Sequence, residues 1–143
     1  MDKDQNDGPP ILPLEVREEY RRKLLSVWEH TQAVRAAAVK LSTRLIDNAE
    51  TENDLELARR LLQRCSKHDL SKFQYHVDGI SAMNDAQVAE MVCDWYARQS
   101  EMGTDFRSFI RKDAPNRWGF TTKSKIYKTI KRFVDLLLDP IFK

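Results

Sequence analysis

The sequence predicts an all-α fold, a single-domain bundle of five or six helices. Over several long stretches apolar residues recur at three- and four-residue steps, which is the spacing of one buried helix face. The 143 residues include only four glycines and five prolines, too few for the frequent turns of an all-β domain. A chain of this length suits one domain with its own core. We therefore expect a flexible lead at residues 1–12 and a helical domain over residues 13–143.

The first helix is expected to start near Pro13, because proline is well tolerated in a first helical turn. The helical pattern then continues for more than thirty residues. A helix of thirty residues spans ~45 Å, which is long for a small domain, so we expect a break or bend around residues 26–30. The predicted buried stripe consists of Leu24, Val27, Val34, Ala37 or Ala38, Leu41 and Leu45.

The second helix should start after an N-cap at Thr51 and end near His68. Its predicted buried side consists of Leu55, Ala58, Leu61, Leu62 and Cys65. Residues 70–83 fit either a short strand or a helical turn. A third helix is expected from an N-cap at Asn84 or Asp85 to a stop at Gly103.

Three shorter segments complete the prediction. A short helix capped by Thr104 should end near Arg111, and residues 112–120 should form a loop. A last helix, capped by Thr121 or Thr122, should end near Leu138. Its apolar stripe is Ile126, Ile130, Phe133, Val134 and Leu137.

The composition of the chain limits the partners and the cellular location that we expect. The net charge of +2 does not by itself indicate a nucleic-acid partner. No run approaches the ~18–20 apolar residues of a membrane span, and the polar, acidic N-terminus is unlike a signal peptide. We therefore expect a cytoplasmic protein with no membrane partner. Cys65 and Cys93 both lie in apolar helical patterns, which favours buried free thiols over a disulfide.

Four acidic or imidazole side chains, at three places in the chain, fall on apolar helix faces, where polar groups need partners. His30 lies on the stripe of Val27, Val34 and Leu41. His68 and Asp69 continue the stripe of the second helix, and Asp94 interrupts an apolar helix. Each has a structural explanation: a bond from His30 to a backbone carbonyl, a favourable histidine charge at a helix end, and an ion pair of Asp94 with Arg98. Imidazole and carboxylate groups are also the ligands of divalent cations.

Taken in order, His30, the adjacent His68-Asp69 pair and Asp94 resemble the HD-domain superfamily of metal-dependent phosphohydrolases. His68-Asp69-Leu70-Ser71-Lys72 is similar to the family's His-Asp-apolar-Gly-Lys turn, with serine in place of glycine. The resemblance extends over roughly residues 26–98, and the chain is most similar to short HD-like proteins of bacteria and phages. It implies an HD-like helical fold and, for a phage protein, a location in the host cytoplasm.

The resemblance also implies a mechanism. His30, His68, Asp69 and Asp94 would hold one divalent cation (Mn, Co, Ni, Mg or Fe), which would activate water against a nucleotide or a related phosphoester. Lys72 would hold a phosphate oxygen, and Glu29 is a candidate general base.

The alternative is a catalytically inactive HD-like module that binds a nucleotide, a nucleic acid or a host protein. The interval from Asp69 to Asp94 is shorter than in most HD enzymes, which favours this alternative. Lys125, Lys128 and Arg132 share one face of the last helix and form a candidate phosphate-binding surface. A solvated helix face is the structural explanation of the same pattern.

Overall fold

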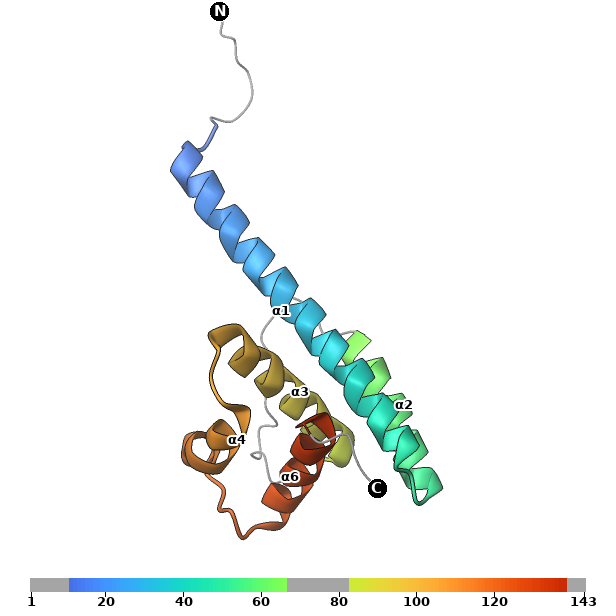
Figure 1. Ribbon diagram of the computed structural model, residues 1–143. Helices are drawn as coiled ribbons and strands as arrows, with labels where there is room; N and C mark the ends of the chain where they lie inside the picture. Colours follow the sequence, from blue (N-terminus) through green and yellow to red (C-terminus); the bar gives the residue numbers. More distant parts are fainter. Residues whose placement is uncertain (1–10, 67–82, 139–143) are drawn as a thin grey trace, which may run out of the picture.

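The computed structural model describes residues 11–66 and 83–138, and these residues form helices and turns without a strand (Figure 1). The elements in chain order are α1 (Leu14–Asp47), α2 (Glu52–Ser66), α3 (Asp85–Met102), α4 (Phe106–Ser108), a π-helical turn (Phe109–Asp113), α5 (Ala114–Trp118) and α6 (Lys125–Leu138). The prediction of an all-α bundle is confirmed. Among these residues no helix has the length and apolar character needed to cross a membrane.

α1 is a single uninterrupted helix and runs straight in Figure 1, so the predicted break or bend at residues 26–30 is wrong. Sharp kinks arise at proline, glycine or π-bulges, and α1 contains none of these. Its C-terminal part packs on α2, α3 and α6, whereas its N-terminal part extends beyond the bundle (Figure 1).

The buried stripe of α1 begins at His30 and includes Thr31, Val34, Ala37, Ala38, Leu41, Ser42 and Leu45. The prediction is therefore right from Val34 onward. It is wrong for Leu24 and Val27, which remain exposed because α1 extends past the helices that cover it.

α2 begins at Glu52, as a cap at Thr51 predicts, and the Asp54 carboxylate accepts a hydrogen bond from the Glu50 backbone N–H. Its buried residues are Leu57, Ala58, Leu61 and Cys65. The prediction that Leu55 and Leu62 also face the core is wrong, because both side chains are exposed. The hydroxyl of Ser42 on α1 donates to the carbonyl of Ala58, which fixes α2 against the buried face of α1.

Both predicted ends of α3 are confirmed. Asn84 and Gln87 form a reciprocal capping box, in which each side chain accepts a hydrogen bond from the other residue's backbone N–H. Gly103 ends the helix with φ of 70°, a conformation that glycine adopts without strain.

The segment after α3 differs from the prediction. Asp105, not Thr104, caps α4, because its carboxylate accepts from the Ser108 N–H. Residues 112–118 are helical rather than looped. Pro115 would clash with the carbonyl four residues earlier in a regular α-helix. The π-turn lies just before Pro115, where the Ala114 N–H bonds to the carbonyl of Phe109, and this wider turn accommodates the ring.

α6 buries the whole predicted stripe from Ile126 to Leu137. It begins at Lys125 rather than directly after Thr121 or Thr122, and the Ser124 hydroxyl accepts from the Tyr127 N–H as the capping contact. At its other end the Arg44 guanidinium donates to the carbonyls of Leu136 and Leu137, both at 2.8 Å. α1 therefore supplies the C-terminal cap of α6.

Candidate functional site

His30 and Asp94 meet where α1 crosses α3. Nε2 of His30 lies 2.6 Å from Oδ1 of Asp94, although the two residues are 64 positions apart in the chain. The side chains are only 11% and 16% exposed, so both polar groups are largely withdrawn from water. The structure thus brings together two of the four residues predicted as metal ligands.

Glu101 completes this group and was not predicted. Its Oε2 lies 2.7 Å from Nδ1 of His30, on the opposite side of the imidazole ring from Asp94. Glu101 follows Asp94 by seven positions, which is two helical turns, so both carboxylates project from the same side of α3. That spacing was the available signal, but Glu101 lies in a polar run near the helix end and no apolar stripe marks it.

The two carboxylates favour the protonated ring. The hydrogen bond with Asp94 is the largest cause of a raised pKa of His30; burial opposes it, and the bond with Glu101 raises the pKa further. An imidazolium can donate one hydrogen bond to each carboxylate, whereas a neutral ring can donate only one. In the neutral tautomer with the proton on Nδ1, Nε2 and the Asp94 oxygen would face each other as two acceptors, which a cation between them would relieve.

We expect Glu101→Gln to lower the pKa of His30. The amide keeps the shape of the side chain and can still accept a hydrogen bond, but its negative charge is lost. NMR titration of the histidine ring in the metal-free protein measures this shift. Glu29→Gln is the matched control, because Glu29 neighbours His30 in sequence yet is exposed. An unchanged pKa in Glu101→Gln would contradict the contact with Nδ1.

The end of α2 contacts residues that neighbour this group in sequence. Nε of Arg35 donates to the carbonyl of Cys65 at 3.3 Å, and Arg35 lies five residues after His30 on α1. The Cys93 thiol, one residue before Asp94, is hydrogen-bonded to the Cys65 thiol. Burial is the largest cause of a raised pKa of Cys93, and this hydrogen bond raises the pKa further. Both cysteines are buried and free, in agreement with the prediction. His68, Asp69 and Lys72, which follow α2, lie outside the described residues.

The described residues test part of the fit to a metal ion. Within residues 11–66 and 83–138, no group of three or more His, Cys, Asp or Glu side chains is arranged to hold one. His30 and Asp94 supply one imidazole nitrogen and one carboxylate, the donor types of a catalytic divalent site. A carboxylate on the other ring nitrogen is also the usual partner of a metal-bound histidine. The donor chemistry fits, with two further ligands required from elsewhere.

The remaining predicted residues within the described ranges are Glu29 on α1 and three basic residues on α6. Glu29 is exposed and points about 100° around α1 from His30. Arg132 pairs with Asp54 at 2.9 Å, so a carboxylate on α2 offsets much of its charge. Lys125 and Lys128 are exposed on α6. A shallow cavity of about 470 Å³ beside them is lined by Lys128, Lys131, Arg132, Asn48, Glu50, Asp135 and Leu136.

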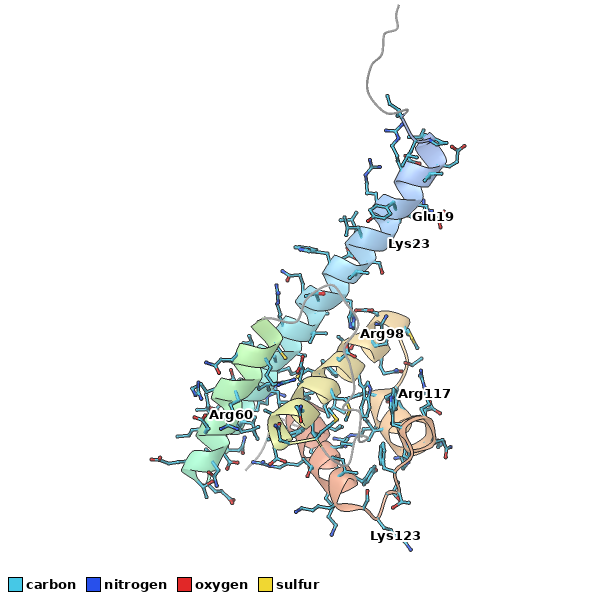
Figure 2. The ribbon with its side chains drawn as sticks, turned by 180° about the vertical axis from the view of Figure 1, so that it is seen from behind. Glu19, Lys23, Arg60, Arg98, Arg117 and Lys123 are labelled. Carbon is cyan, nitrogen blue, oxygen red and sulfur yellow. The ribbon has the colours of Figure 1, made fainter. Side chains whose placement is uncertain are left out.

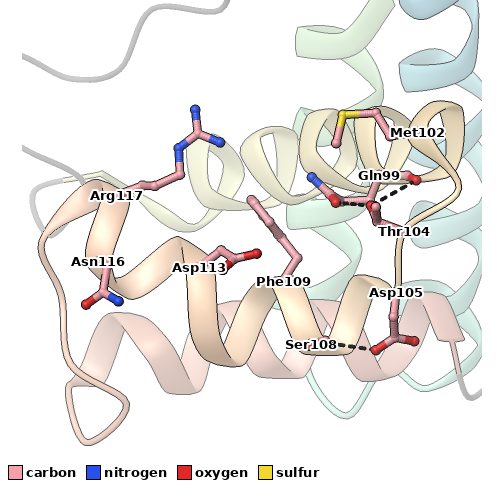
Figure 3. Close-up of a pocket in the computed structure, with 9 residues that line it drawn as sticks. All are labelled: Gln99, Met102, Thr104, Asp105, Ser108, Phe109, Asp113, Asn116 and Arg117. Atoms are coloured by element: carbon pink, nitrogen blue, oxygen red, sulfur yellow. Dashed lines mark hydrogen bonds between the residues drawn. The ribbon is translucent and has the colours of Figure 1, made fainter.

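A second shallow cavity, of about 500 Å³, lies between the end of α3 and the α4–α5 segment (Figure 3). Asp105, Asp113, Asn116 and Arg117 line it, together with Gln99, whose side chain bonds to the Thr104 hydroxyl. Gln99 follows Asp94 by five residues and therefore projects roughly 140° away from it around α3. This cavity contains none of the predicted site residues.

Comparison with known proteins gives no relative that could supply a function. No protein-family model, curated protein or solved structure matches the chain.

Proposed function

We propose that the protein is a small HD-like, metal-dependent phosphohydrolase that acts on a nucleotide or a related phosphoester. The observation that carries the proposal is the 2.6 Å contact between His30 and Asp94. These residues were selected from the sequence as co-ligands of one cation, and they come from separate helices. A shared ligand set predicts this meeting, whereas three unrelated structural explanations do not.

The path of the chain also supports the proposal. α2 packs along α1, and its Cys65 contacts Arg35, five residues after His30, and Cys93, one residue before Asp94. His68 and Asp69 follow Cys65 by three and four residues. A chain of three or four residues extends at most ~10–14 Å, so in the proposed site this pair joins His30 and Asp94 without a long connection.

Each residue of the chain has a defined role in the proposed site. His30 binds through Nε2, while Glu101 holds Nδ1–H and thereby fixes the tautomer and the ring orientation. Asp94, Asp69 and His68 complete the set, and Lys72 binds a phosphate oxygen as a point charge. When bound, a divalent cation (Mn, Co, Ni, Mg or Fe) supplies an activated water and neutralises charge on the phosphoryl group.

One observation favours the alternative, an HD-like module that binds a ligand without turnover. His30 protonated between Asp94 and Glu101 is a satisfied buried network that needs no metal. On this alternative the lysines of α6 contact the ligand, and Lys128 and Arg132 already line a common cavity.

The test is metal binding and hydrolysis by the purified full chain. We expect one divalent ion per chain by calorimetric titration, and phosphate release from a nucleotide panel that stops when a chelator is added. Failure of every tested cation to bind would overturn the proposal. Nucleotide binding that persists with chelator but weakens in Lys128→Glu and Arg132→Glu would instead establish the binding module.

A further inference from the structure

The N-terminal part of α1 presents an uncovered apolar surface. Residues 14–28 extend roughly 20 Å from the bundle, and all of them are exposed (Figures 1 and 2). The exposed apolar side chains of this projecting segment include two aromatic rings, Tyr20 at 70% and Trp28 at 52% exposure. Contiguous apolar patches of this kind usually mark an interaction site.

The spacing of these residues indicates what covers them. Val16, Tyr20, Leu24 and Val27, which we call the seam, recur at steps of four, four and three residues. The same alternation continues through Thr31, Val34, Ala38, Leu41 and Leu45, which are buried within the bundle. The seam is thus the continuation of a face that already packs against helices, and three-and-four spacing is the pattern of helix-on-helix packing.

We propose that the seam pairs with the seam of a second copy of the chain, so that two projecting segments form an antiparallel two-helix interface. A two-fold axis at Tyr20 would align residues 14–26 of the two copies, because Tyr20 is the middle residue of that stretch. Leu24 of each copy then lies beside Val16 of the other. Such an isologous contact buries the seam on both copies and closes on itself, which is the commonest form of protein dimer.

Charge is compatible with self-association in this orientation. The projecting segment carries three acidic and four basic side chains, so two copies do not repel strongly. Glu19 and Lys23, both labelled in Figure 2, already pair within α1 at 3.2 Å. Their helical positions put them along one border of the seam. In the antiparallel pair with its axis at Tyr20, Glu19 of one copy is level with Arg21 of the other, and Lys23 lies two residues, about 3 Å along the helix, from that level.

Sedimentation analysis of the full chain tests the pairing. We expect a concentration-dependent dimer, and Leu24→Glu should raise its dissociation constant by at least about tenfold. Val39→Glu is the matched control: it makes the same kind of change on α1 at a side chain that is 56% exposed but lies outside the seam. Circular dichroism should show that both variants keep the helical bundle. A wild-type chain that stays monomeric up to near-millimolar concentration overturns the proposal, as does equal weakening by both variants.

Disulfide cross-linking tests the orientation. In the antiparallel pair, a mixture of Val16→Cys and Leu24→Cys chains should form cross-linked dimers under mild oxidation, whereas Leu24→Cys alone should not. The native cysteines are buried and do not compete. Efficient cross-linking of Leu24→Cys with itself would show parallel helices and overturn the proposed arrangement.

Discussion

Asp94→Asn is expected to abolish divalent-cation binding. Asparagine keeps the size of the side chain but replaces a charged oxygen ligand by a neutral amide, which binds hard cations far more weakly. Loss of a group that only orients a metal ligand typically costs ~10–100-fold in affinity, so loss of a direct ligand should cost more than that. Calorimetric titration measures the change, with Asp47→Asn, an exposed carboxylate at the end of α1, as the control. Wild-type affinity in Asp94→Asn would place the cation elsewhere.

The pH dependence of stability and of metal affinity distinguishes the His30 ion pairs from metal binding, and Asp94→Asn tests both. In the metal-free protein the pKa of His30 is raised above 6.5, so its ion pairs stabilise the fold fully below that value and less as pH rises through the folded-state pKa. Asp94→Asn removes the largest cause of this shift and should flatten that pH dependence. In the wild type, metal affinity should fall as pH falls through the His30 pKa, because a proton competes for Nε2. Metal affinity that is independent of pH would argue against His30 as a ligand.

The resemblance to the HD superfamily joined His30 and Asp94 as candidate co-ligands, whereas their places on apolar helix faces indicated only that each polar group needs a partner. The sequence was sufficient for the ends of α3, where Asn84, Gln87 and Gly103 act through local hydrogen bonds and backbone conformation. The inferences about α3 depend only on residues within one turn of each end of the helix. Such features are encoded locally and survive without knowledge of the tertiary structure.

The errors share a different cause. Periodicity showed that α1 has an apolar face, but not how far α2 and α3 extend along it, so Leu24 and Val27 were assigned to the core. The bend in α1 was predicted because a straight helix of this length exceeds the size of a small domain, and the sequence does not show that one end extends beyond the bundle. Glu101 was missed because its role is set by the position of His30 on another helix. Pro115 was taken for a loop residue because proline signals a helix interruption, whereas the π-turn before it lets the helical path continue.

Phe133→Ala is expected to be the most destabilising change in the core, by about 3–5 kcal/mol. The ring is fully buried on α6, and truncation would leave a cavity where this helix packs on α1 and α3. Urea unfolding followed by circular dichroism measures the free energy of unfolding. Ile46→Ala, at a 51% exposed position on α1, is the control and should change it by less than about 0.5 kcal/mol.

This core position also bears on the candidate site, because α6 contacts the two helices that carry His30 and Asp94. Arg44 ties the end of α6 to α1, while Phe133 and its neighbours fill the space between α6, α1 and α3. If this packing sets the distance between α1 and α3, metal affinity should fall in Phe133→Ala even under conditions where the variant is fully folded. Destabilisation below about 1 kcal/mol would contradict the packing of α6. A folded variant with wild-type metal affinity would show that the α1–α3 crossing is held without α6.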